Sequence, residues 1–257
     1  MNPTTPAPPP VSNGPVSNGP VLNGIGLTKS FGSTRALDAV DIAVAAGESV
    51  AVMGPSGSGK STLLHCLANI ERPDSGEVLL AGERIDQLRE PHRSELRRTR
   101  FGFVFQFGQL LPELPAVENV ALPLMLGGMS RREAQQRAAG WFAPLGLTGK
   151  EDSRPGELSG GQAQRVALAR ALVAGAQVVF ADEPTGALDQ TTGQEVIRLL
   201  VEVTKAQNAA LVVVTHDQSV ARWCDRTVQV RDGRIVRETS SSSSSRDSAD
   251  AGIGVTR

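Results

Sequence analysis

The sequence predicts a doubly wound α/β domain, in which a parallel sheet carries helices on both faces. Short, continuous apolar runs at residues 49–53, 178–181 and 211–214 are typical of strands buried on both sides. Apolar residues with helical spacing follow the first run at residues 60–70 and lie between the other two at residues 192–205. This alternation of strands and helices indicates a doubly wound core.

Both ends of the chain have compositions that oppose folding. Residues 1–24 are rich in proline and carry the pentapeptide VSNGP twice in succession, and residues 239–257 contain a run of serines. Neither segment has enough apolar side chains to form a core. We therefore expect a disordered leader at residues 1–24, a folded domain at residues 25–238 and a disordered tail at residues 239–257.

Three further segments complete the expected domain. Residues 76–85 alternate apolar side chains around a central Ala-Gly, which predicts antiparallel strands beside the core. Residues 88–100 are rich in arginine and predict a solvated helix face. Residues 107–164 contain prolines and helix-like stretches but few β-branched runs, so a helical insertion is expected there.

The composition excludes several classes of function. The chain has 257 residues and a net charge of −1, so no global basic field would concentrate it on nucleic acid. No apolar stretch approaches the roughly 18 residues that span a bilayer. Two cysteines, outside any Cys-x-x-Cys pattern, and a leader without secretory features predict a reducing, cytoplasmic location.

A glycine-rich stretch after the first apolar run has the pattern of a phosphate-binding P-loop. Backbone N–H groups of such a turn, and of the helix that follows it, point at phosphate oxygens. Lys60 would neutralise β- and γ-phosphate charge, and Ser61 would hold Mg²⁺. The candidate nucleotide-binding residues are Gly54, Pro55, Ser56, Gly57, Ser58, Gly59, Lys60, Ser61 and Thr62.

Two adjacent carboxylates stand at the end of the second apolar run. Residues 178–184 read VVFADEP, which places Asp182 and Glu183 at the carboxyl edge of a sheet, where ligands bind in open α/β proteins. Asp182 suits the surroundings of Mg²⁺. Glu183 faces the other way and is a candidate to orient and deprotonate a water that attacks the γ-phosphate. At this point a kinase, a GTPase or a helicase-like enzyme all remain open.

Residues 158–162 read LSGGQ and precede a helical run, and this motif resembles the signature of the ABC ATPase family. A serine and two glycines at a helix N-terminus form a second anion site. The resemblance covers residues 25–238 and implies a P-loop ATPase fold with a RecA-like parallel core, an antiparallel β subdomain and a helical subdomain at residues 107–164. It adds further ATP-binding residues, namely Ser159, Gly160, Gly161 and Gln162.

The resemblance assigns roles to four more residues. Gln106 in FVFQF matches the glutamine of the Q-loop and is expected both as a catalytic residue and as a metal ligand with Ser61 and Asp182. Asp189 in GALD matches the D-loop aspartate, and His216 in VVVTHD matches the switch histidine that supports Glu183. Phe31 stands where the family usually stacks a tyrosine on adenine, and Phe retains the aromatic face.

The family implies a head-to-tail pair of cassettes that enclose two ATP molecules, as a homodimer or a heterodimer with a related subunit. Residues 110–126 and the stretch PTGALD resemble the subgroup for lipoprotein release, macrolide export and cell division. This implies an integral membrane permease as partner, peripheral attachment to the cytoplasmic face of the membrane, and no nucleic acid. The apolar residues Leu111, Leu114, Val117 and Leu122 are expected to supply a docking patch, or else to belong to the core of the helical subdomain. The alternatives are a soluble ABC ATPase acting on DNA or ribosomes, and a nucleotide-gated signalling module with low turnover.

Overall fold

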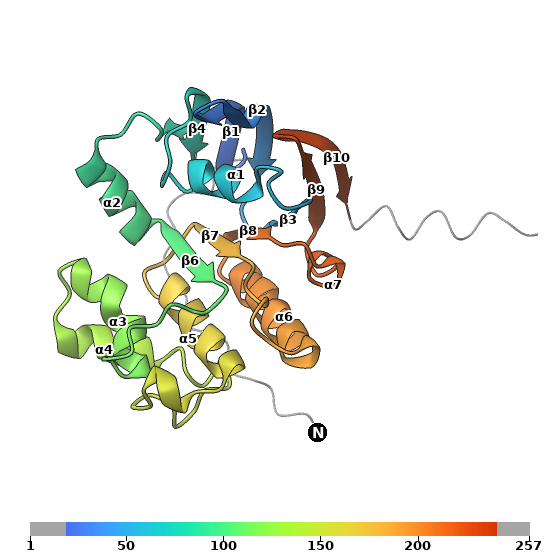
Figure 1. Cartoon of the computed structure of the whole chain (residues 1–257). Coiled ribbons are helices and arrows are strands. Elements are labelled where there is room, and N and C mark those ends of the chain that lie inside the picture. Colours follow the sequence, from blue (N-terminus) through green and yellow to red (C-terminus); the bar gives the residue numbers. More distant parts are fainter. Residues whose placement is uncertain (1–18, 241–257) are drawn as a thin grey trace, which may run out of the picture.

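The computed structural model describes residues 19–240 (Figure 1). The expected leader up to residue 18 and the expected tail from residue 241 lie outside the described residues. The boundaries drawn from the sequence fall inside strands, because β1 (Leu22–Phe31) begins before residue 25 and β10 (Arg234–Ser240) continues past residue 238. Leu22 is buried in the core, so the folded domain begins with the last residues assigned to the leader.

A six-stranded sheet forms the centre of the domain, in the order β10-β9-β3-β8-β7-β6. Its neighbours pair in parallel except for the hairpin of β9 and β10. This confirms the predicted doubly wound core and all three strands predicted from apolar runs. The strands other than β10 are β3 (Ser49–Met53), β6 (Phe101–Phe105), β7 (Val178–Asp182), β8 (Ala210–Val214) and β9 (Arg226–Arg231).

A smaller antiparallel sheet lies beside the core, in the order β2-β1-β4-β5. It contains β1, β2 (Thr34–Val44), β4 (Ser75–Leu80) and β5 (Glu83–Arg84). Strand β1 pairs with β2 on one side and β4 on the other, so its backbone groups are bonded along both edges. The antiparallel strands predicted at residues 76–85 are therefore confirmed.

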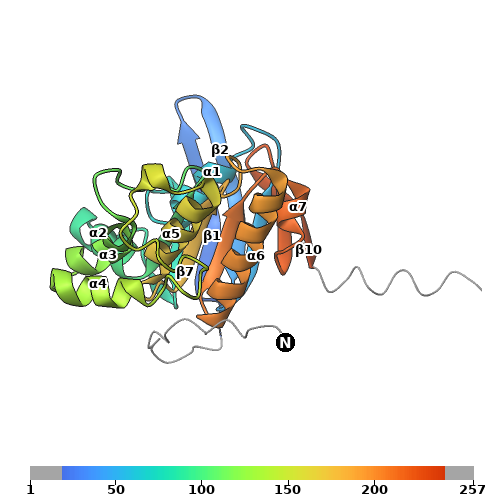
Figure 2. The ribbon, with the colours of Figure 1, turned by 90° about the horizontal axis from the view of Figure 1, so that it is seen from below.

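The helices form two groups. Those flanking the sheet are α1 (Lys60–Leu67), α5 (Gly160–Leu172), α6 (Gln190–Ala206) and the short α7 (Gln218–Ala221). Figure 2 shows a second group at the side of the domain away from β10, made of α2 (Glu90–Thr99), α3 (Ala116–Leu126) and α4 (Arg131–Ala139). The predicted helical insertion thus contains α3, α4, the 3-10 turn η1 (Pro155–Glu157) and the first residues of α5.

The two faces of the central sheet contribute side chains to two separate hydrophobic cores. On β8, Leu211 and Val213 pack with residues of α5 and α6, whereas Val212 and Val214 pack with residues of α1 and the small sheet. Alternate side chains of a strand point to opposite faces, which explains the division. Figure 1 shows the result, with α1 on one side of the sheet and α5 and α6 on the other. Among the described residues, no helix is both long and apolar enough to cross a bilayer.

Candidate functional site: a nucleotide site at the carboxyl edge of the sheet

The predicted P-loop connects β3 to α1, as the sequence indicated. A Cβ atom on Gly54 would lie 2.1 Å from the Val230 carbonyl oxygen, and one on Gly59 would lie 2.3 Å from that of Ala36. Only glycine lets the loop approach these two backbones. Helix α1 begins after Gly59 without a side-chain cap, so its first N–H groups are available to an anion.

The other loop residues differ in how they face solvent. Pro55, Ser56 and Gly57 are exposed, whereas Ser58 is buried and its carbonyl oxygen accepts a hydrogen bond from the Gly233 N–H. Ser58 therefore anchors the loop to the β9–β10 turn. The Lys60 ammonium donates to the Pro55 carbonyl at 2.8 Å, which folds this charge back across the loop.

Asp182 is the last residue of β7, at the same edge of the sheet as the P-loop. Burial raises the pKa of the Asp182 carboxyl, and the charge of Glu183 adds to this effect. The charges of His65 and Lys60 and the Ser61 hydroxyl act in the opposite direction on that pKa. A partly buried carboxylate beside a second carboxylate is suited to a cation.

Glu183 occupies a left-handed backbone conformation, with φ of 47°. Side chains other than glycine and asparagine rarely adopt this region, and such strain gathers at functional sites. The conformation turns the Glu183 carboxylate toward His216, with 2.8 Å between Oε1 and Nδ1, and toward the Thr215 hydroxyl at 3.4 Å from Oε2. The hydrogen bond to Glu183 and its charge raise the pKa of His216.

Asp189 closes this side of the site. It is the N-cap of α6, and its carboxylate accepts a hydrogen bond from the Thr192 N–H at 3.0 Å. The bond from Thr192 lowers the pKa of Asp189, so this carboxyl stays ionised. Glu183, Asp189 and His216 line one cavity of about 360 Å³. The structure thus brings His216 to the two acidic residues, although it lies 33 residues from Glu183 in the sequence.

Gln106 follows β6 directly, and β6 pairs with β7 so that Phe105 stands opposite Asp182. The Gln106 side chain lies against the turn after Glu183, because a Cβ atom on Gly186 would be 2.8 Å from its Nε2 atom. The predicted Q-loop residue is therefore beside the acidic pair.

The signature residues are at the N-terminus of α5, as the motif predicted. Ser159 is the N-cap and Gln162 completes a capping box, with the Ser159 N–H donating to Gln162 Oε1 at 2.9 Å. Gln162 is thus turned back onto its own helix start. Ser159 and Gly160 are exposed. Helices α5 and α1 pack on opposite faces of the sheet, so one chain does not bring its signature to its own P-loop.

Phe31 is at the end of β1 and half-exposed, at 52%. The Lys29 ammonium lies 5.4 Å from the centre of its ring. An exposed aromatic ring beside a cation is not a core residue, and the ring is free to stack on a planar ligand.

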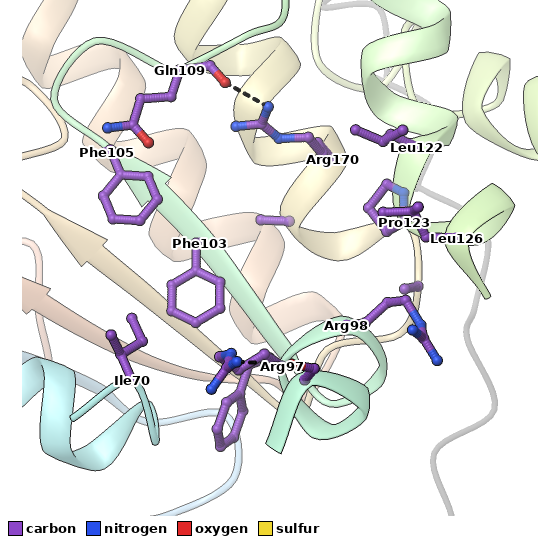
Figure 3. Close-up of a pocket in the computed structure, with 14 residues that line it drawn as sticks. Ile70, Arg97, Arg98, Phe103, Phe105, Gln109, Leu122, Pro123, Leu126 and Arg170 are labelled. Atoms are coloured by element: carbon purple, nitrogen blue, oxygen red, sulfur yellow. Dashed lines mark hydrogen bonds between the residues drawn. The ribbon is translucent and has the colours of Figure 1, made fainter. Parts of the chain in front are cut away.

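A groove of about 620 Å³ lies between β6, α2, α3 and α5 (Figure 3). Phe103 and Phe105 form its floor, and Leu122, Pro123 and Leu126 face them from α3. Of the predicted docking residues, Leu122 lines this groove and Leu111 is exposed. Val117, on α3, is a core residue and not a docking residue, because its side chain is 8% exposed and packs in the hydrophobic core.

The arginine-rich segment is also less solvated than predicted. Arg93 of α2 is buried, and its guanidinium donates to the carbonyl oxygens of Asn69 and Ile70. The pattern of charges in the sequence cannot show whether an arginine is solvated or, like Arg93, is buried and bonded to carbonyl oxygens. Arg97 and Arg98 lie further along the helix and line the groove.

Two polar residues of α5 escaped the sequence interpretation. Gln164 and Arg170 both donate hydrogen bonds to backbone carbonyls of the segment from Phe105 to Gln109. In the sequence they are two of the four polar residues of this helix, and nothing there distinguishes them from Gln162 and Arg165.

The glycine loop at an uncapped helix start, the acidic pair at the adjacent strand end and the histidine bonded to the second acid define a P-loop nucleoside triphosphatase. The exposed, serine-capped start of α5 is a second helix N-terminus, and its helix packs on the other face of the sheet.

Comparisons with known proteins place the chain within this class. The ABC transporter family model matches residues 37–186. The lipoprotein-releasing system ATP-binding protein LolD of Bacteroides thetaiotaomicron is 43% identical over 83% of this chain and 98% of that protein. The macrolide export ATP-binding/permease protein MacB of Chromobacterium violaceum is 46% identical over 78% of this chain, which spans 31% of that longer protein.

Solved structures agree. A dimer of the ATP-binding cassette MJ0796 with bound ADP and Pi, described as a post-hydrolysis state, has a TM-score of 0.76 and 38% identity, covering 86% of this chain and 98% of that one. The chain belongs to the ABC transporter family and is an ATP-binding, ATP-hydrolysing cassette. The predicted family and fold are confirmed, and transport is supported over the alternative of an ATPase acting on DNA or ribosomes.

Proposed function

We propose that the chain drives an export-type or mechanically signalling ABC transporter, as one of two cassettes attached to an integral membrane permease at the cytoplasmic face of the membrane. The observation that carries this proposal is the near full-length match to a lipoprotein-releasing ATP-binding subunit, joined to a groove suited to a membrane partner. The transported substrate is selected by the permease and not by this chain.

Two cassettes are required by the placement of the two anion sites. The P-loop helix α1 and the signature helix α5 of one chain are on opposite faces of the sheet. A second cassette in head-to-tail orientation brings its Ser159 to the phosphates on the first P-loop. Because the sequence contains one complete set of motifs, the partner cassette is a second copy or a related subunit.

The hydrolysis step follows from Glu183 and its neighbours. Its carboxylate is held by His216 and Thr215, in a position to orient a water and accept its proton. With Nδ1 bonded to Glu183, the other ring nitrogen of His216 is left for the γ-phosphate. Lys60 and the first N–H groups of α1 neutralise the phosphate charge, and Phe31 stacks on the adenine ring.

The donor atoms fit Mg²⁺. Asp182, Ser61 and the amide oxygen of Gln106 are hard oxygen ligands, which Mg²⁺ prefers. When bound, the ion supplies charge neutralisation to the β- and γ-phosphates.

The groove on β6 is the proposed docking site for a cytoplasmic segment of the permease. Its floor and α3 wall are apolar, and Arg97, Arg98 and Arg170 line it. The Nε atom of Arg98 is buried and has no hydrogen-bond partner among the described residues. An amphipathic helix that carries a carboxylate fits this lining, since it would cover the phenylalanines and bring its negative charge to the arginines of the groove.

The proposal is tested by capture of the permease. Tagged Glu183→Gln protein is expressed in the native cells, held closed with Mg²⁺-ATP, and recovered from detergent-solubilised membranes for mass spectrometry. We expect an integral membrane protein with a large extracytoplasmic domain, and little of it with Lys60→Ala as bait. Recovery of only DNA or ribosomal components overturns the transporter assignment, and normal ATP turnover by Glu183→Gln overturns the role of Glu183.

A charge-reversed groove tests where the permease binds. Arg98→Glu added to the Glu183→Gln bait should lose the membrane protein in the same capture, while Arg98→Glu alone should leave ATP turnover of the purified cassette intact. Arg237→Glu is the matched control, because this exposed residue is on β10 at the opposite edge of the sheet. Equal recovery with both variants rejects the groove as the docking site.

A further inference from the structure

A single buried amide connects three parts of the molecule that are distant in sequence. Gln164, on the second turn of α5, is 2% exposed. Its Nε2 atom is 2.8 Å from the Phe105 carbonyl oxygen, 2.8 Å from that of Gln106 and 2.7 Å from that of Pro184. These carbonyls belong to the end of β6, to the Q-loop and to the residue directly after Glu183.

The orientation of this amide is fixed by its surroundings. An amide nitrogen carries two N–H groups and the amide oxygen carries none, so three converging carbonyl oxygens require the nitrogen end. The Oε1 atom is buried without a hydrogen-bond partner among the described residues. A buried polar atom left unpaired is costly, so the three contacts on the nitrogen side must outweigh it.

A second side chain of α5, that of Arg170, also bonds the backbone that follows β6. Arg170 donates to the carbonyl oxygens of Gly108 and Gln109 at 2.7 and 2.8 Å. Its guanidinium is largely buried, and this burial lowers the pKa of Arg170. The segment from Phe105 to Gln109 is thus bonded to α5 through its backbone, which leaves the side chain of Gln106 free to act.

We propose that Gln164 is a positioning residue for ATP hydrolysis, which sets the backbone of Gln106 and of the Glu183–Pro184 turn relative to the signature helix. The proposal rests on the roles assigned above to Gln106 and Glu183. Gln164 does not touch the nucleotide site itself. It acts because a displacement of about 1 Å in a catalytic group can lower a rate by about 100-fold.

This role separates two effects of a substitution. Within one cassette the nucleotide is held by the P-loop and Phe31, and Gln164 contacts neither, so the affinity of the single cassette for ATP is retained. The chemical step depends on the placement of Gln106 and Glu183, so turnover falls. A residue with a purely structural role would lower stability and leave both kinetic constants of the folded fraction unchanged.

The test compares Gln164→Met with Thr204→Val. The methionine side chain is similar in length to that of glutamine but has no N–H group to donate. Thr204 is the matched control, since it is also buried and donates to a carbonyl, that of Leu200 at 2.7 Å, roughly 22 Å along α6 from Asp189. Both variants are measured as the purified full-length cassette for ATPase kcat and KM, for fluorescent-nucleotide affinity and for Tm.

We expect Gln164→Met to lower kcat by about 10- to 100-fold, with KM for ATP within about threefold of wild type. Thr204→Val should lower the Tm by a similar amount and leave kcat unchanged. If Gln164→Met keeps its kcat while Glu183→Gln loses turnover, the positioning role is wrong and the proposed function stands. If Glu183→Gln itself turns over normally, the assigned role of Glu183 fails first.

Discussion

The starts of α5 and α6 are in close contact. The effect of Gly161→Ala on the free energy of unfolding should therefore change sign when Thr192, its neighbour on α6, is shortened to serine. Gly161 is the second residue of α5, and a Cβ atom there would lie 2.5 Å from the Cγ2 methyl of Thr192. Carbon atoms in favourable contact are about 3.5–4.0 Å apart. Gly161→Ala therefore forces the two helix starts apart by about 1 Å.

Two opposing effects set the magnitude. Overpacking of this kind destabilises by about 1–3 kcal/mol. Replacing glycine by alanine in a helix stabilises by about 0.5–1 kcal/mol. Gly161→Ala alone should thus lower the free energy of unfolding by up to about 2.5 kcal/mol. With Thr192→Ser, which removes the methyl and keeps the backbone N–H bonded to Asp189, the same change should raise it by about 0.5–1 kcal/mol.

The assay is a double-mutant cycle of four proteins in urea without nucleotide. Unfolding is followed by tryptophan fluorescence, to which the buried Trp141 contributes. The expected coupling between the two positions is about 1–3 kcal/mol. If Gly161→Ala has the same effect in both backgrounds to within about 0.5 kcal/mol, the steric reasoning is refuted.

Three further predictions concern single groups. The raised pKa of His216 means that its pairing with Glu183 stabilises the fold below the unfolded pKa of 6.5 and that this stability is lost as pH rises through the folded pKa. The Tm difference between wild type and His216→Gln should therefore be larger at about pH 6 than at about pH 9, and a pH-independent difference would contradict the pairing. Burial raises the pKa of Cys66 and of Cys224 to about 12, so a thiol reagent at about pH 8 should label both only after unfolding, and rapid labelling of the native protein would count against this packing. Asp189→Ala should lower the Tm because α6 loses its N-cap, whereas Asp189→Asn, which can still accept from the Thr192 N–H, should keep most of the wild-type Tm.

The parts of the fold that the sequence predicted are those whose signal is local. Strands β3, β7 and β8 are continuous apolar runs, because both of their faces are buried. Strand β1 contains asparagine and glycines, which disfavour strands, and its formation depends on pairing with two neighbours that are distant in sequence. This is why the domain boundary was placed after the strand had already begun.

In the site, too, local motifs were predicted and contacts between distant residues were not. Each motif was recognisable because its residues are adjacent, and the ends of parallel strands meet at one edge. The contact of Glu183 with His216 spans 33 residues, and that of Gln164 with Phe105 spans 59. No local pattern specifies the partner of a buried glutamine. Residues that act through another group are therefore the ones that sequence reasoning missed.

Strand β6 supplies the last physical connection between the groove and the hydrolysis site. Its alternation places Phe103 and Phe105 on the groove floor, and the next residue is Gln106. Arg170 lines the groove and bonds the same backbone segment that Gln164 holds. A partner that moves in the groove therefore acts on a segment fastened to the helix that begins at Ser159. Under the proposed function, one short stretch of backbone connects the permease to this chain's own hydrolysis site and to the signature offered to the other cassette.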